Sequence, residues 1–373
     1  LQKYLNYKNF SIYRSFNVDD FFLTSNNDDI IHKSNLKYQK IINLIKSKSD
    51  LLNLKIENIY VGDLIYDTYL KRFSRPTVDI NEKNFFALLK LSIQIFYFWK
   101  NFFTENKVCC FVISDTTYIS SIVIRIAAEK NIKIFQCNWD NIHKIDYSNL
   151  YAYAKYKFYK KDFEKLTDNQ KKIALKKAEM NIKKNIMTDD HINSSFLLSK
   201  TTGISKTTFH GNFTAQNLLK KNTKKKILIA VHCFLDAPHV FGNHGNIFCD
   251  FYEWLEYLYK LSKKTNYDWY IKNHPTSSPK TNEILEHFLK DKPEFELISS
   301  DVSHTQLIYE GISCVLTVHG TIGWEYAYNE IPVINASVNN PHSDYNFNLH
   351  AKNLKEYEEM ILDFEKYKIN YDK

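Results

Sequence analysis

The stretch of sequence that decides the fold is Ser313–Ser337, SCVLTVHGTIGWEYAYNEIPVINAS. It opens with an apolar run, SCVLTV, and closes with a second one, IPVINAS; between them lie a turn with two glycines and the helix-like WEYAYNE. Runs this apolar are typical of strands covered on both faces, as in a parallel sheet with helices on each side. The alternation of strand and helix therefore predicts an α/β protein.

The same alternation occurs twice more along the chain. Lys224–Phe234 and Asp268–Pro275 read as strands on either side of a helix over Asn246–Lys264. Earlier, Val108–Ser114 and Ile132–Cys137 frame a second apolar helix. Two groups of such units predict two Rossmann-like domains that face one another, each built on a parallel sheet.

These units also suggest where the domains begin and end. We expect an N-terminal Rossmann-like domain over residues 1–215 and a second one over residues 216–350. In the remaining segment, 351–373, a helix over Lys352–Tyr367 is expected to pack back across the N-terminal domain. A chain of 373 residues has room for two or three domains of ordinary size.

Composition excludes several classes of protein. Only 8 Gly and 7 Pro occur, which argues against collagen-like and low-complexity architectures. The excess of 50 Lys and Arg over 42 Asp and Glu gives a net charge of +8, which favours an anionic partner. Six cysteines without a Cys-x-x-Cys pair fit free thiols in a reducing cytoplasm, and the first residues show no apolar secretion signal, so we expect a cytoplasmic protein.

Two segments raise the question of membrane contact. Phe85–Phe103 is strongly apolar, but its two lysines and a glutamine argue against a membrane span and favour a core helix, with an in-plane interfacial helix as the alternative. Lys160–Asn185 is a strongly basic helical stretch. It reads either as a solvated helix face or as a peripheral contact with anionic lipid on the inner face of the cytoplasmic membrane.

The turn HGTIGWE begins directly after an expected strand, where α/β sheets bind ligands. His319, Gly320 and Thr321 would lie at the start of the next helix, where backbone amides favour a phosphate. Glu325 lies one turn further along and would reach ribose hydroxyls. The alternative is a tight turn whose threonine caps the helix.

A second polar element ends a strand of the same expected sheet. The segment KNHP places the ammonium of Lys272 and the imidazole of His274 at the carboxyl edge, toward the same crevice as the glycine turn. Both side chains are suited to contact a leaving phosphate. A structural role for His274 is the alternative.

The third polar element is the loop after the first strand of the second domain. It carries Asp236, His239 and His244 after His232. Their spacing matches no zinc pattern, and Asp236 is better read as a catalytic carboxylate or a loop cap. The chain has no Asp-x-Asp, so we expect chemistry without a metal or other cofactor.

Other motifs are absent from the sequence. It contains no Gly-x-x-x-x-Gly-Lys phosphate loop, no Gly-x-Gly-x-x-Gly fingerprint and no Gly-x-Ser-x-Gly nucleophile elbow. Kinase, dehydrogenase and common hydrolase functions therefore lose support. No nucleic-acid-binding module is recognisable, so we expect no nucleic acid partner.

Taken together, these motifs resemble those of bacterial surface-polysaccharide glycosyltransferases of the GT-B type. The sequence is similar to the retaining β-Kdo transferases of capsule and lipopolysaccharide synthesis, and more distantly to the polysialyltransferases. KNHP, HGTIGWE and Asp236-Ala237 carry the resemblance within Lys224–Glu359, and VGDLIYDTYLKRF (Val61–Phe73) is a fainter N-terminal echo. The chain departs from the pattern at Asn273, where the group has Pro, and at Pro238, where the Kdo enzymes usually have Ser.

The resemblance implies a GT-B-like fold and a glycosyltransferase. The donor would be a CMP-sugar, such as CMP-Kdo, and the acceptor a saccharide or lipid-linked saccharide. Asp236 and His274 would be catalytic, with Asp236 as nucleophile in a retaining reaction or as general base in an inverting one. Lys272, His319, Gly320, Thr321 and Glu325 would bind the donor. The N-terminal domain would bind the acceptor near Asp63, Asp67 and Tyr118.

Two other functions remain open at this point. One is a phosphotransferase that moves glycerol phosphate from CDP-glycerol, as in teichoic-acid polymerases, which resemble the same layout and also release CMP. The other is a non-catalytic nucleotide-binding protein of the same fold. The linkage in the product separates the first from a glycosyltransferase, and turnover separates the second.

Overall fold

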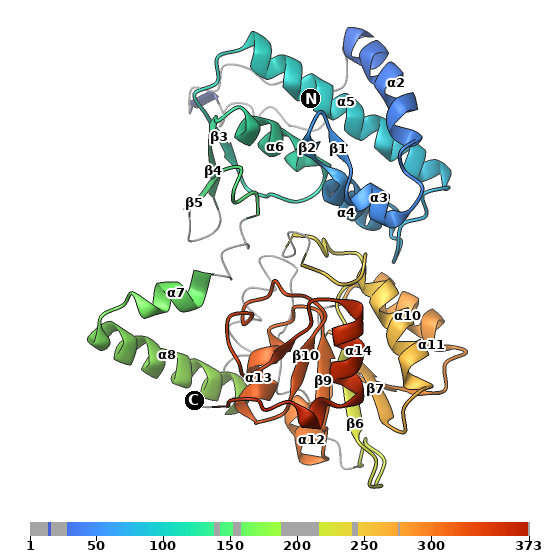
Figure 1. Ribbon diagram of the computed structural model, residues 1–373, viewed down its shortest axis with the longest axis vertical. Coiled ribbons are helices and arrows are strands. Elements are labelled where there is room, and N and C mark those ends of the chain that lie inside the picture. The colour runs from blue at the N-terminus through green and yellow to red at the C-terminus, as the bar shows by residue number, and fades with distance from the viewer. Residues whose placement is uncertain are drawn as a thin grey trace. The chain divides into compact units, whose positions relative to one another are not determined.

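The computed structural model describes residues 14–15, 28–137, 142–151, 158–187, 216–240, 245–274 and 277–371 (Figure 1). The chain forms two compact units. The first comprises residues 1–66 and 79–150, and the second comprises residues 67–78 and 151–373. This division differs from the expected boundaries, because residues 151–215 and the segment 67–78 group with the second unit.

The first unit combines helices with two small sheets. Its elements are α2 (Asp28–Ile42), α3 (Lys48–Leu52), β1 (Lys55–Ile56), β2 (Ile59–Tyr60), the start of α4 (Gly62–Phe73), α5 (Lys83–Glu105), β3 (Cys110–Ile113), η1 (Ile119–Ser121), α6 (Ile122–Glu129), β4 (Lys133–Cys137) and β5 (Ile142–Ile145). The buried residues of α5 include Phe85, Leu89 and Phe96, and α5 contacts α2 and α6. The expected core helix is confirmed. No helix among the described residues is long and apolar enough to cross a membrane.

The larger sheet of the first unit is not fully parallel, which corrects the sequence-based prediction. Its order is β3-β4-β5; β3 and β4 are parallel, but β5 runs antiparallel to β4. Only four residues, 138–141, join β4 to β5. A parallel pair needs a crossover of about a dozen residues or more, so this short connection dictates an antiparallel strand.

The second unit confirms the expected α/β architecture. Its strands are β6 (Lys226–Ala230), β7 (Asp268–Lys272), β8 (Phe295–Ile298), β9 (Cys314–Thr317), β10 (Val333–Asn335) and β11 (Leu349–His350). They form one parallel sheet in the order β11-β10-β9-β6-β7-β8. The first strand lies in the middle, the next two continue to one side and the last three to the other. This is the Rossmann strand order, with its switch point between β6 and β9.

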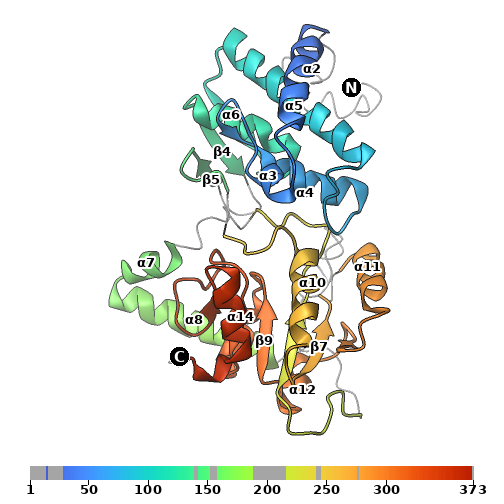
Figure 2. The same cartoon turned by 45° about the vertical axis from the view of Figure 1, so that its right-hand side comes forward.

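Side chains of alternating direction bury both faces of this sheet. Ile227 and Ile229 belong to one apolar cluster, whereas Leu228 belongs to another on the opposite face. The first cluster contains residues of α10 (Phe251–Ser262), α11 (Pro279–Leu289) and α14 (Leu354–Leu362), and the second contains residues of α12 (His304–Tyr309) and α13 (Ile322–Tyr328). Figure 2 shows α10 and α14 beside the strands. The strands are apolar along their whole length because helices cover both faces of the sheet.

The C-terminal helix is part of the second unit. Expected over Lys352–Tyr367, it spans Leu354–Leu362 and is followed by a short 3-10 turn, η3 (Phe364–Lys366). Its Tyr357 is fully buried, and the hydroxyl accepts a hydrogen bond from Trp254 Nε1 of α10 at 2.8 Å. The helix therefore packs on the sheet of its own unit, and the expected contact with the N-terminal domain stays a prediction.

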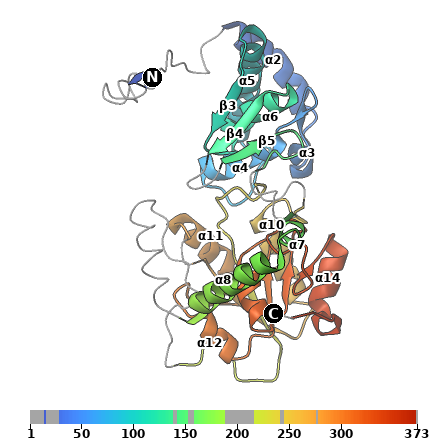
Figure 3. The same ribbon diagram turned by 90° about the vertical axis from the view of Figure 1, so that its left-hand side faces the viewer.

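The basic stretch forms two helices of the second unit, α7 (Tyr159–Glu164) and α8 (Asp168–Met187). Figure 3 shows α8 crossing the front of this unit. Ile173 and Met180 of α8 are 56% and 62% exposed. The helix thus presents apolar side chains, together with its lysines, to solvent.

Candidate functional site

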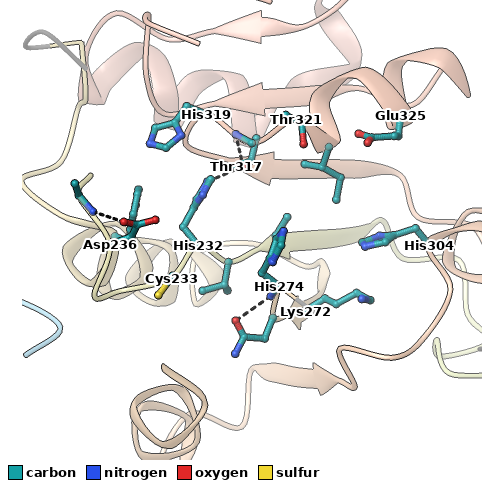
Figure 4. Close-up of a pocket in the computed structure, with 17 residues that line it drawn as sticks. His232, Cys233, Asp236, Lys272, His274, His304, Thr317, His319, Thr321 and Glu325 are labelled. Carbon is teal, nitrogen blue, oxygen red and sulfur yellow. Dashed lines mark hydrogen bonds between the residues drawn. The ribbon is translucent and has the colours of Figure 1, made fainter. Parts of the chain in front are cut away.

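The candidate site is a cavity of about 280 Å³ in the second unit. It lies at the carboxyl ends of β6, β7 and β9, beside the switch point of the sheet (Figure 4). Parallel strands bring their carboxyl ends to one edge, and ligands of such sheets bind there. The structure brings together at this edge every residue predicted to be catalytic or donor-binding: Asp236, Lys272, His274, His319, Gly320, Thr321 and Glu325.

The loop after β6 supplies a carboxylate. Asp236 is exposed, and its Oδ1 accepts a hydrogen bond from the backbone amide of Ala237 at 2.9 Å. Nearby, the thiol of Cys233 lies 3.2 Å from the hydroxyl of Thr281. An exposed carboxylate that lines the cavity is accessible to a bound ligand.

The end of β7 supplies a buried ammonium. Lys272 is 2% exposed, and its Nζ donates a hydrogen bond to the carbonyl of Ser300 at 2.7 Å. Burial lowers the pKa of Lys272 to about 8, partly offset by the charge of Asp301. Burial, and next the positive charge of Lys272, lower the pKa of His274. At neutral pH the cavity therefore holds a charged Lys272 beside a neutral His274.

The end of β9 and the start of α13 supply His319, Thr321 and Glu325. Burial lowers the pKa of His319 to about 4 and raises the pKa of Glu325 to about 7. The Oε2 atom of Glu325 is buried and has no hydrogen-bond partner among the described residues. A ligand hydroxyl that reached this oxygen would satisfy it, so Glu325 is suited to hold a sugar or ribose hydroxyl.

Two histidines that line the cavity were given no role in the sequence-based prediction. His304 comes from α12, and its Nδ1 lies 2.9 Å from the hydroxyl of Tyr326. His232 follows β6, and its Nε2 lies 3.0 Å from the hydroxyl of Thr317. A polar residue directly after the first strand of the unit was the available signal for His232. No local signal identified His304, because it is the first residue of α12 and follows β8, an edge strand that the sequence pattern did not predict.

A buried polar network supports the turn between β9 and α13. His342 Nε2 lies 3.3 Å from the carbonyl of Gly320, and its Nδ1 lies 3.1 Å from the amide nitrogen of Asn348. Asn348 in turn donates to the carbonyl of Gly323 at 3.0 Å. Burial lowers the pKa of His342 to about 3, so this imidazole is neutral. The network thus holds the backbone of the turn at Gly320 and Gly323.

The residues expected to bind the acceptor do not line this cavity. Asp63 receives two hydrogen bonds from Arg125, at 2.7 and 2.6 Å, and both side chains are buried. Asp67 pairs with His239: its Oδ1 lies 2.5 Å from His239 Nδ1. Tyr118 has a positive φ of 61° and precedes η1. Because its carboxylate is neutralised inside the first unit, Asp63 is suited to hold the fold together.

The described residues contain no group of three or more His, Cys, Asp or Glu side chains arranged to hold a metal ion. Of the loop residues considered as metal ligands, His239 is buried against Asp67, and His244 lies outside the described residues.

No protein-family model matches the sequence, and no curated protein is significantly similar to it. Among solved structures, the chain is similar to UDP-GlcNAc 2-epimerase from Neisseria meningitidis bound to UDP-GlcNAc. The alignment covers 74% of this chain and 73% of that chain, at 12% identity and a TM-score of 0.31. The fold assignment rests on the strand order described above.

Proposed function

We propose that this protein is a glycosyltransferase that uses a nucleotide-activated sugar. The donor is a CMP-sugar, with an ulosonic acid such as Kdo as the sugar, and the acceptor is a saccharide or a lipid-linked saccharide. One observation carries the proposal: Asp236, Lys272, His274 and Glu325 line a single cavity at the switch point of a sheet with Rossmann strand order.

The charge of the cavity supports a nucleoside monophosphate as leaving group. Among the described residues that line the cavity, Lys272 is the cation at neutral pH, because burial keeps the imidazoles of His232, His274 and His319 neutral. One ammonium balances the single charge of a phosphate diester, whereas a diphosphate needs further positive charge.

The reaction follows from the position of Asp236. In a retaining reaction the Asp236 carboxylate attacks the anomeric carbon, the bond from that carbon to the phosphate oxygen breaks, and CMP leaves with the electron pair. Lys272 and His274 stabilise the departing phosphate. The acceptor hydroxyl then displaces Asp236 and passes its proton to a neutral imidazole. In an inverting reaction Asp236 takes that proton and the hydroxyl attacks directly.

A ligand and product screen tests the proposal. CMP should stabilise the folded protein by about 2.7 kcal/mol at a hundredfold excess over its Kd, which appears as a rise in melting temperature. EDTA should not abolish this rise. With CMP-Kdo and saccharide acceptors, release of CMP should accompany a new glycosidic linkage. Selective stabilisation by UDP or GDP with Mg²⁺ would contradict the choice of donor.

The same observation favours one other function, because CDP-glycerol also leaves CMP in the cavity after transfer of glycerol phosphate. A phosphodiester linkage in the product would establish this glycerophosphotransferase activity. Tight CMP binding without turnover of either donor would instead identify a non-catalytic nucleotide-binding protein.

We also propose that α8 rests on an anionic membrane surface, where a lipid-linked acceptor would be found. Ile173, Lys176, Lys177 and Met180 follow the spacing i, i+3, i+4, i+7, so they share one face of the helix, and all four are exposed. Lysines among exposed apolar side chains suit a surface that combines anionic head groups with an apolar interior.

A further inference from the structure

The imidazole of His232 is held on several sides. Its Nε2 lies 3.0 Å from Thr317 Oγ1 and receives a hydrogen bond from the backbone amide of Val318 at 3.2 Å. The ring stacks on Phe251, with centroids 4.6 Å apart, and its centroid lies 4.7 Å from that of His319. These contacts fix the orientation of the ring before any ligand arrives.

The contacts at Nε2 also determine which nitrogen carries the proton. A backbone N–H only donates, so the bond from Val318 requires a lone pair on Nε2. The Thr317 hydroxyl can donate to the same lone pair, whereas a proton on Nε2 would face the Val318 N–H. Burial lowers the pKa of His232 well below its usual value, which keeps the ring neutral. The proton is therefore on Nδ1.

The Nδ1–H group has no hydrogen-bond partner among the residues that the structure describes. His232 lines the cavity and is only partly buried, so a ligand in the cavity can reach its ring. Gly320 helps to keep the ring close to the turn: a Cβ at Gly320 would come within 2.8 Å of Thr317 Oγ1 and 3.5 Å of His232 Cε1.

We propose that His232 is a ligand-binding residue that donates a hydrogen bond from Nδ1–H to an anionic oxygen of the substrate. This inference rests on the proposed function, since it assigns a role in the same cavity. The oxygen belongs to the phosphate of the nucleotide or to the carboxylate of the sugar. A neutral donor held in one tautomer and one orientation needs no reorganisation when the anion binds.

Two substitutions separate this role from a structural one. In His232→Gln the amide replaces the contacts of Nε2 with Thr317 and Val318 but leaves no donor at the position of Nδ1. In His232→Asn the amide nitrogen replaces Nδ1–H, but the Val318 amide loses its acceptor. We expect His232→Gln to keep its melting temperature and lose about tenfold to a hundredfold in ligand binding, as for a hydrogen bond to a charged group. His232→Asn should melt lower and keep most of its affinity.

The two sources of the oxygen are distinguished by CMP and CMP-Kdo. A phosphate contact weakens CMP binding in His232→Gln, measured by calorimetry. A carboxylate contact leaves CMP binding unchanged and raises the KM for CMP-Kdo. Wild-type affinity and KM in His232→Gln, with the loss appearing only in His232→Asn, would overturn the inference. If His232→Asn fails to fold, His232→Gln alone decides.

Nitrogen NMR of the histidine side chains tests the inference without any turnover. His232, assigned by its loss in His232→Gln, should show a pyrrole-type Nδ1 and a pyridine-type Nε2, and inorganic phosphate or CMP should shift the Nδ1–H signal. The opposite tautomer, or no shift with phosphate, CMP or CMP-Kdo, would overturn the inference. A shift with phosphate but none with any nucleotide would uphold the donor role of His232 and contradict the proposed function.

Discussion

His342 occupies the space that a side chain on Gly323 would need. A Cβ at Gly323 would lie 2.4 Å from His342 Nε2, 2.6 Å from its Cε1 and 3.0 Å from Asn348 Nδ2. Both partners are fully or almost fully buried and hydrogen-bonded to each other. The start of α13, with Thr321 and Glu325, is therefore fitted closely against an imidazole that itself never reaches the cavity.

Gly323→Ala should destabilise the protein by about 1–3 kcal/mol because the methyl group overlaps His342. Without this overlap, alanine in a helix would stabilise by roughly 0.5–1 kcal/mol, so the sign of the change is informative. Urea unfolding measures it. His342→Ala makes room for the methyl group, and the double variant should be more stable than the sum of the single changes predicts. Additive effects would show that the two residues do not conflict.

Glu325 predicts a pH-dependent stability. Burial raises its pKa from 4.5 to about 7, so between these values the unfolded state loses its proton first and stability falls as pH rises. Glu325→Gln removes this dependence. Relative to wild type, its free energy of unfolding should be similar at about pH 4 and higher by on the order of 3 kcal/mol at about pH 8. An equal difference at both pH values would contradict the burial of this carboxyl group.

Lys272 predicts opposite effects on binding and folding. Lys272→Met should weaken CMP binding about tenfold or more by removing a charged hydrogen-bond donor, while removal of a buried charge should leave stability unchanged or higher at neutral pH. In wild type, CMP affinity should fall as pH rises through about 8, where Lys272 loses its proton. Titration calorimetry across this pH range measures both the loss of CMP affinity in Lys272→Met and the pH dependence of the affinity in wild type. The same decline in Lys272→Met would assign it to another group.

Asp236→Asn tests the mechanism. The amide keeps the shape of the side chain and removes its charge, so turnover should be lost while folding and CMP binding persist. If Asp236 only caps its loop, stability should fall by about 1 kcal/mol or less and turnover should persist. Intact-mass spectrometry of wild type after brief exposure to donor should show one added sugar if the reaction is retaining. An inactive variant without a wild-type adduct would leave the general-base role.

Membrane contact through α8 predicts a charge-specific binding assay. The protein should co-sediment with phosphatidylglycerol vesicles and not with phosphatidylcholine vesicles, and added salt should weaken binding. Reversal to Glu of Lys176 and Lys177, together with the exposed Lys172 beside Ile173, should abolish binding. As a control with the same change of charge, reversal of the exposed Lys280, Lys355 and Lys366 should have little effect. Equal losses in both variants would indicate an effect of net charge alone.

Local sequence patterns were enough to locate the site. Each polar element was recognised because it follows an apolar run directly, as Lys272 and His319 do, and the ends of parallel strands necessarily lie at one edge. The sequence also indicated the buried helix α5, since its apolar residues recur at helical spacing. In the first unit the sequence pattern predicted a parallel sheet and did not identify β5, whose short connection to β4 makes it antiparallel.

The sequence by itself therefore indicated β6, β7, β9 and β10, the helices that follow β6 and β9, and the polar residues that end these strands, since these properties depend on neighbours along the chain. Only the tertiary structure placed β9 beside β6, which brings His232 to Val318 across 86 residues and determines the tautomer of the imidazole. It also decided the protonation of Glu325 and Lys272. Their pKa values depend on how completely distant segments exclude water from each side chain, and no local pattern encodes that exclusion.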